Sequence, residues 1–165
     1  MPLLHQTAID DVLTVRLCGP DDAETVHRLT QAAFGPYAGF LDPPSGALRE
    51  DVATVRRDLD SYGGAIAWSG AEPVGCMRFQ VEDGHMHVRR VAVTPDHQRQ
   101  GIGTVLMAWA EAHARSLGLH EVTLGVRKQL PGNRAFYARR GYEVVAGRRH
   151  PGRTDVTWYE MRLQL

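Results

Sequence analysis

A glycine turn between an apolar strand and an amphipathic helix is the feature that most constrains this chain. The apolar-rich run Val88–Val93 leads to the turn Gln98–Thr104, and an amphipathic run follows over Ile102–Leu117. The first turn of a helix has N–H groups without partners and a partial positive charge, so this arrangement suits a phosphate. Gly101 and Gly103 lack a Cβ, so a bulky anion can approach the backbone closely. The turn is therefore predicted to hold the pyrophosphate of a large cofactor.

Two common phosphate-binding loops do not fit the residues around this turn. A dinucleotide-binding turn would have a third glycine or an alanine where this chain has Leu106. A nucleoside triphosphate loop ends in Gly-Lys-Ser/Thr, and no lysine follows either glycine. Both kinds of loop are therefore disfavoured.

The composition suits one compact domain. The chain has 165 residues, which is long enough for one real core and short for two. Its 19 basic and 19 acidic side chains cancel, so neither nucleic acid nor a membrane is expected as a partner. The longest apolar run, Val105–Ala110, falls far short of the about 20 residues that span a bilayer. No cysteine and histidine cluster has zinc spacing, so no metal is expected.

The N-terminus and the cysteines predict the compartment. The first six residues lack the basic start and the apolar stretch of a signal peptide. Cys18 and Cys76 are far apart, and each lies in an apolar, strand-like context, so both are predicted to be reduced core residues. A cytoplasmic location is therefore expected.

Hydrophobic periodicity and turn residues predict an alternation of strands and helices. Residues 1–11 show no clear period and are predicted to form a loose arm. Strands are expected at 12–18, 65–68, 74–81, 85–93, 120–126, 142–146 and 157–163, and helices at about 21–34, 45–60, 102–117 and 131–141. A strand, a glycine loop, a helix and a strand in succession make a βαβ unit, so strands 85–93 and 120–126 should be parallel. No linker or repeat is visible, so residues 1–165 are expected to form a single α/β domain.

The sequence of the turn and a second motif resemble those of a known family. Residues 90–103 closely resemble the acyl-CoA-binding motif of the GNAT N-acetyltransferase superfamily, a strand followed by Gln/Arg-x-x-Gly-x-Gly/Ala. Residues 133–142 are similar to its second signature, Asn-x-x-Ala-x-x-x-Tyr-x-x-x-Gly-Phe/Tyr. They depart from it in one respect, because Tyr137 directly follows Phe136, four residues after Asn133. The resemblance spans residues 12–164 and is most specific from about 85 to 142.

The resemblance implies a fold and an activity. The fold would be α/β of the α+β kind, a mixed and mostly antiparallel sheet of about six to seven strands with a splayed parallel pair, flanked by about four helices. The activity would be acetyl transfer from acetyl-CoA, without a metal, to a primary amine of a small molecule or peptide, directly within a ternary complex. Members are often dimeric, which makes a homodimer a candidate state. A catalytically silent acyl-CoA-binding module and an unrelated phosphate-binding domain are the alternatives.

The resemblance also assigns the coenzyme A site. The loop amides would hold the pyrophosphate, the preceding strand would bind the pantetheine arm, and Asn133 would contact the cofactor. The implied cofactor-binding residues are Val91, Ala92, Val93, Gln98, Arg99, Gln100, Gly101, Gly103, Thr104, Asn133, Phe136 and Tyr137. Tyr137 would protonate the leaving thiolate, for which a phenol with a pKa of about 10 is suited. The alternative is that Tyr137 is a core aromatic beside Phe136.

The general base is open at this stage. Strict alternation along 85–93 puts His85, His87, Arg89, Val91 and Val93 on one face, and Met86, Val88, Arg90 and Ala92 on the other. His87 falls where members of the family often have a glutamate, and a histidine titrates near neutrality. Glu82, Asp83 or a bound water could take the same role, and both histidines could instead be half-exposed residues at a strand end.

The acceptor pocket is predicted from two loops. The aromatic stretch around residues 34–50 would tuck into the core, cover a pocket, or do both, and the loop 147–153 would close the pocket. Candidate acceptor-binding residues are Phe34, Tyr37, Phe40, His85 and His150. The charges do not decide the class of acceptor. Arg148, Arg149 and Arg153 would favour an anionic acceptor, whereas Asp42 and Glu50 would favour an amine.

Overall fold

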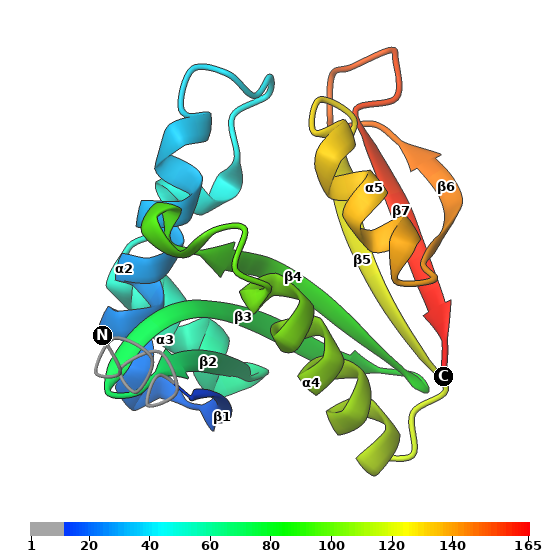
Figure 1. The fold of residues 1–165 in the computed structure, drawn as a ribbon. Helices are drawn as coiled ribbons and strands as arrows, with labels where there is room; N and C mark the ends of the chain where they lie inside the picture. Colours follow the sequence, from blue (N-terminus) through cyan, green and yellow to red (C-terminus); the bar gives the residue numbers. More distant parts are fainter. Residues whose placement is uncertain (1–11) are drawn as a thin grey trace, which may run out of the picture.

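The computed structural model describes residues 12–165, and the arm expected at 1–11 lies outside them. A seven-stranded sheet runs through the molecule in the order β1-β2-β3-β4-β5-β7-β6 (Figure 1). Its strands are β1 (Leu13–Cys18), β2 (Gly64–Ser69), β3 (Glu72–Glu82), β4 (His85–Val93), β5 (Glu121–Arg127), β6 (Glu143–Arg148) and β7 (Trp158–Gln164). All neighbouring strands are antiparallel except β4 and β5, which confirms the expected mostly antiparallel sheet with one parallel pair.

Four α-helices flank the sheet. They are α2 (Ala23–Phe34), α3 (Val52–Ser61), α4 (Ile102–Ser116) and α5 (Pro131–Arg139), and four short 3-10 turns accompany them: η1 (Pro20–Asp22), η2 (Gly35–Tyr37), η3 (Gly46–Arg49) and η4 (Pro95–His97). Helices α2 and α3 cover one face, while α4 covers the other (Figure 1). None of the helices within residues 12–165 has the length and apolar character needed to cross a membrane.

The helix predicted at 45–60 is wrong in its first half. The chain makes the turn η3, becomes extended at Glu50 with ψ 138°, and only then starts α3. Asp51 is the N-cap, because its Oδ1 accepts a hydrogen bond from the Thr54 N–H at 2.7 Å. The apolar period continues through the break, so the pattern alone did not reveal it.

Two hydrophobic clusters lie on opposite faces of the sheet. Ile66 and Cys76 pack under α2 and α3, whereas their strand neighbours Ala65 and Met77 belong to the cluster under α4. This alternation is what a sheet covered on both faces requires. Cys18 and Cys76 are free thiols, as expected, and Cys76 is fully buried.

A β-bulge in β4 overturns the predicted faces of that strand. Arg90 has a φ of 54°, and the pairing steps from Arg78↔Arg89 to Cys76↔Ala92, so one extra residue is inserted in β4. Because side chains alternate with period two, this insertion reverses the parity beyond it. Val91 therefore packs against the α4-side cluster, and Ala92 lies in the cluster under α2 and α3.

Strands β4 and β5 separate soon after they meet. Their parallel pairing covers three residue pairs, the last of which is His87↔Thr123. Beyond that pair, β5 stays hydrogen-bonded to β7 on its other side as far as Arg127, so the two halves of the sheet diverge (Figure 1). The edge of β4 from Val88 onward has no strand partner on the β5 side among the described residues.

Candidate active site

A cavity of about 600 Å³ occupies the opening between β4 and β5. Its walls come from the end of α2, the segment 41–49, the two diverging strands, α5 and the β6–β7 loop. Six of the residues singled out from the sequence line it: Phe34, His87, Val91, Asn133, Tyr137 and His150. The fold thus brings together side chains that are up to 116 positions apart (34 to 150).

Three other candidates lie outside the cavity lining. Phe40 is exposed to solvent over 57% of its surface. Tyr37 packs edge-on against Phe34 with ring centroids 6.0 Å apart. His85 lies at the paired start of β4, with Nε2 3.6 Å from a carboxylate oxygen of Glu82. These three side chains do not line the space between the strands.

The glycine turn is built as an open backbone cradle. Arg99 and Gly101 both adopt left-handed conformations, with φ of 66° and 81°, and Gly101 is the N-cap of α4. The first N–H to bond back inside the helix is that of Val105, to the Gly101 carbonyl at 3.1 Å. Within residues 12–165 no backbone carbonyl accepts from the N–H groups of 99–104, so they are available to an anion.

The exposed edge of β4 continues this cradle into the opening. The Gln98 side chain donates Nε2–H to the Val93 carbonyl at 3.1 Å, whereas the next N–H, of Thr94, bonds to Val74 on β3. In a strand the N–H and C=O of one residue point to the same side, and successive residues alternate. Val93 and Val91 therefore direct their backbone groups into the opening, and Ala92 directs its own toward β3. An extended, amide-bearing arm could bind this edge like an added strand.

Tyr137 projects from α5 into the cavity. Its ring packs edge-on against Phe136 and Tyr142, with centroids 5.0 Å and 5.8 Å away. Burial, helped by the neighbouring Tyr37, raises the pKa of Tyr137 to about 12, so the phenol keeps its proton at neutral pH. Phe136 contacts the first turn of α4, because a Cβ on Gly103 would lie 3.5 Å from its ring. Helix α5 is thereby fixed against the glycine turn.

His87 lies where the two strands part. Its Nδ1 is 2.9 Å from Oγ1 of Thr123, the residue opposite it on β5. Burial, followed by the positive charge of Arg89, lowers the pKa of His87 below its ordinary 6.5, so the ring is neutral at pH 7. When Nδ1–H donates to Thr123, Nε2 carries the free lone pair that a general base needs. Glu82 and Asp83, the carboxylate alternatives, do not line the cavity.

The sequence matches one protein family over most of its length. Residues 24–142, well over half of the chain, match the acetyltransferase (GNAT) family. The chain belongs to the GNAT family. It is therefore an acyltransferase, and acyl-CoA is its co-substrate. The open amides of 99–104 and the free edge of β4 fit such a molecule, with its pyrophosphate and its amide-bearing arm.

Relatives and solved structures agree with this assignment. The chain is 28% identical over 124 residues to the uncharacterized N-acetyltransferase YjcF of Bacillus subtilis, covering 75% of this chain and 84% of that one. Its fold is similar to that of the PaiA N-acetyltransferase of Thermoplasma acidophilum, solved with coenzyme A, at 18% identity and a TM-score of 0.77, covering 93% and 99% of the two chains. The ribosomal-protein-S18-alanine N-acetyltransferase of Escherichia coli follows at 20% identity and a TM-score of 0.76, covering 93% and 94%.

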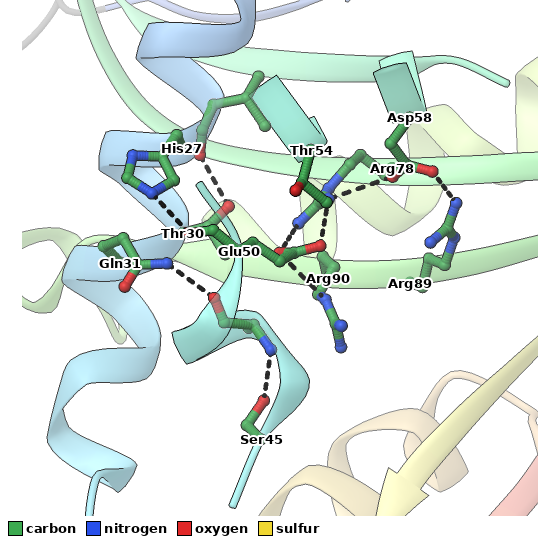
Figure 2. Close-up of polar contacts among 12 residues, drawn as sticks. His27, Thr30, Gln31, Ser45, Glu50, Thr54, Asp58, Arg78, Arg89 and Arg90 are labelled. Carbon is green, nitrogen blue, oxygen red and sulfur yellow. Dashed lines mark hydrogen bonds and ion pairs between the residues drawn. The ribbon is translucent and has the colours of Figure 1, made fainter. Parts of the chain in front are cut away.

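This GNAT chain has a buried ionic cluster behind the cavity wall (Figure 2). The Arg78 side chain, 1% exposed, binds both oxygens of Glu50 at 2.7 and 2.9 Å and reaches Asp58 at 3.1 Å. Although burial opposes ionisation, the Arg78 guanidinium lowers the pKa of Glu50. Arg89 contacts the other oxygen of Asp58, and Arg90 Nε lies 3.5 Å from Glu50. Glu50 is therefore held by arginines and does not line the cavity.

The residues that give the cavity its charge were not predicted from the sequence. The arginines considered from the sequence are engaged elsewhere, because Arg153 pairs with Asp42 at 2.6 Å and Arg148 lies 3.6 Å from Glu160. The arginines that do line the cavity are Arg49, Arg89, Arg90 and Arg127. One sequence feature could have indicated the ionic cluster behind the wall. Arg78 interrupts an apolar strand, and a buried charge requires charged partners from elsewhere in the fold.

Proposed function

We propose that this GNAT enzyme moves an acetyl group from acetyl-CoA directly to a primary amine of a small molecule or peptide within a ternary complex. The observation that carries the proposal is that one cavity, at the point where β4 and β5 part, is lined by both His87 and Tyr137. Its neutral imidazole and its protonated phenol are the base and the acid that acyl transfer to an amine requires.

The roles of the chain's own residues follow from this placement. The amides of 99–104 and the free edge of β4 bind and orient acetyl-CoA, which supplies an activated thioester. His87 Nε2 accepts a proton from the acceptor ammonium or from the nitrogen as it attacks the carbonyl. The Val93 N–H polarises that carbonyl. Tyr137 donates its proton to the departing sulfur, so the thiol leaves uncharged.

Initial-rate kinetics test the direct transfer. Reciprocal plots at several fixed acetyl-CoA concentrations should intersect, because both substrates must be bound before the acyl bond moves. Parallel lines would indicate an acyl-enzyme intermediate and would contradict the proposal. A protein that binds coenzyme A but acetylates no amine would instead be an acyl-CoA-binding module. Calorimetric titration with coenzyme A, run beside ATP and NAD as controls, measures that binding independently.

A further inference from the structure

The cavity wall opposite α4 carries an excess of positive charge. Four arginines line the cavity, and no aspartate or glutamate among residues 12–165 does. The two carboxylates behind the wall, Glu50 and Asp58, are shared among three arginines, Arg78, Arg89 and Arg90. At least one guanidinium in this cluster is therefore uncompensated.

Arg90 is the arginine left over. Glu50 gives both of its oxygens to Arg78, and Asp58 binds Arg78 and Arg89. Arg90 has only the 3.5 Å approach of its Nε to Glu50, and this buried Nε makes no hydrogen bond. Neither terminal nitrogen of Arg90 makes a hydrogen bond to any of the residues that the structure describes, and Figure 2 shows its guanidinium at the edge of the cluster. Because the Arg90 side chain is 28% exposed at the cavity wall, its terminal donors are accessible to an anionic ligand in the cavity.

A second guanidinium converges on the same place. A Cβ on Gly46 would lie 3.0 Å from Nη2 of Arg90 and 3.8 Å from Nη2 of Arg49. The two terminal nitrogens thus face one small region of the wall, from the bulge of β4 and from η3. Two forked cations around one point suit a carboxylate, sulfonate or phosphate, which accept paired hydrogen bonds.

The wall is held in place before any ligand binds. Gln31 Nε2 donates to the Ala47 carbonyl at 2.7 Å, and His27 Nε2 lies 2.9 Å from the Glu50 carbonyl, so α2 fixes the segment that bears Arg49 (Figure 2). Arg127 donates to the carbonyls of Pro43 and Pro44 at 2.6 and 3.3 Å and fixes the preceding loop. The backbone that carries Arg49 is therefore ordered without a ligand, which lowers the cost of forming the site.

This site is separate from the phosphate cradle. The cradle opens at the N-terminus of α4, whereas Arg90 reaches toward Glu50 on the side of the sheet that α2 and α3 cover. His87 lies on the strand that links the two regions. An acceptor anchored at Arg90 would therefore approach His87 from the side opposite to α4.

We propose that the acceptor is an amine that also bears an anionic group, of the amino acid type, and that Arg90 and Arg49 hold that group while the amine faces His87. This inference rests on the proposed function, because it names the class of acceptor for the same cavity. It also predicts that polyamines, which carry only positive charge, are poor acceptors in this cavity.

Matched acceptors test the charge requirement. An amino acid and its C-terminal amide differ at one group, and the amide has the less basic amine, so a preference for the acid cannot come from amine ionisation. We expect kcat/KM to be at least about tenfold higher for the acid, consistent with a charge-assisted hydrogen bond. Equal or better turnover of amides or polyamines would overturn the inference and leave the acetyltransferase proposal standing.

Variants locate the anion. Arg90→Gln and Arg49→Gln should each raise KM for the acid by at least about tenfold and change KM for the amide by less than about threefold. Arg49 is exposed, so that variant keeps the test open if Arg90→Gln does not fold. Arg56→Gln removes an equal charge from an exposed position on α3 and should change neither value. Equal losses for the acid and the amide would reject the assignment.

A binding measurement separates this inference from catalysis. Calorimetric titration with the N-acetylated amino acid and with its N-acetylated amide requires no turnover. We expect the anionic compound to bind at least about tenfold more tightly to the natural protein, and this preference to disappear in Arg49→Gln. Equal binding of the two compounds would overturn the inference, whether or not the protein acetylates amines.

Discussion

The Nδ1 atom of His87 lies 2.9 Å from Oγ1 of Thr123 at the last residue pair that β4 and β5 form before they diverge. The same contact therefore orients the candidate base and marks the apex of the opening. Thr123 thereby fixes the orientation of the imidazole, and when its hydroxyl accepts from Nδ1–H, Nε2 is the nitrogen left as an acceptor.

Removing the Thr123 hydroxyl should impair the base without removing it. We expect Thr123→Val to lower kcat about tenfold, because the imidazole loses the hydrogen bond that orients it. Thr14→Val, at an exposed position on β1, is the matched control and should retain full turnover. A Thr123→Val enzyme as fast as the natural one would show that this contact does not serve catalysis.

The pH dependence of turnover should follow the titration of His87. Burial and Arg89 lower its pKa below 6.5, so the base is neutral at pH 7 and becomes protonated only as the pH falls through that lowered value. Activity is therefore expected to persist in mildly acidic buffer and to fall at a midpoint below 6.5. The profile of His87→Ala should lack this acidic limb. An identical limb in the variant would show that His87 is not the general base.

Tyr137 should matter for the chemical step and little for binding. Tyr137→Phe removes the proton donor but keeps the ring packed between Phe136 and Tyr142, so we expect kcat to fall at least about tenfold with nearly unchanged coenzyme A affinity. Tyr62→Phe, at a residue that is 51% exposed, controls for the loss of a hydroxyl. Undiminished turnover would rule out Tyr137 as the acid.

The backbone of the glycine turn should be sensitive to a single methyl group. Gly101 has a φ of 81°, and an alanine there is strained by about 1 kcal/mol or more, which would displace the amides that face the phosphate. We expect Gly101→Ala to weaken coenzyme A binding about tenfold or more in a calorimetric titration. Gly70→Ala introduces similar strain at φ 59° in a distant turn. It should lower stability alone, and equal binding losses in both variants would indicate a general effect of strain.

The glycine turn and the succession of strands along the chain could be predicted from the sequence because their signals are local. Gly101, Gly103 and the apolar run before them lie within one short stretch, and apolar runs bounded by turn residues identify the strands. The bulge at Arg90 could not be predicted from the sequence, since it exists only in the register between β3 and β4. The one inserted residue moves every later side chain of β4 to the opposite face of the sheet.

The charged wall of the cavity depends on contacts between distant parts of the chain. Glu50 was a candidate for binding an amine until the fold paired it with Arg78, 28 positions away, and Arg153 is neutralised by Asp42, 111 positions away. The charges near each loop in the sequence therefore did not predict that the cavity is lined by positive charge. Arg49 and Arg90 come close together only because the segment that contains Gly46 lies beside the β4 bulge in the folded chain.

Release of free thiol from acetyl-CoA, measured with and without amine acceptors, distinguishes an N-acetyltransferase from a catalytically silent acyl-CoA-binding module. We expect amine-dependent release that is greatest for amino acid-type acceptors. It should be reduced at least about tenfold in both Tyr137→Phe and His87→Ala while coenzyme A still binds. Binding of coenzyme A with no amine-dependent release from any acceptor in the panel would contradict the proposed function.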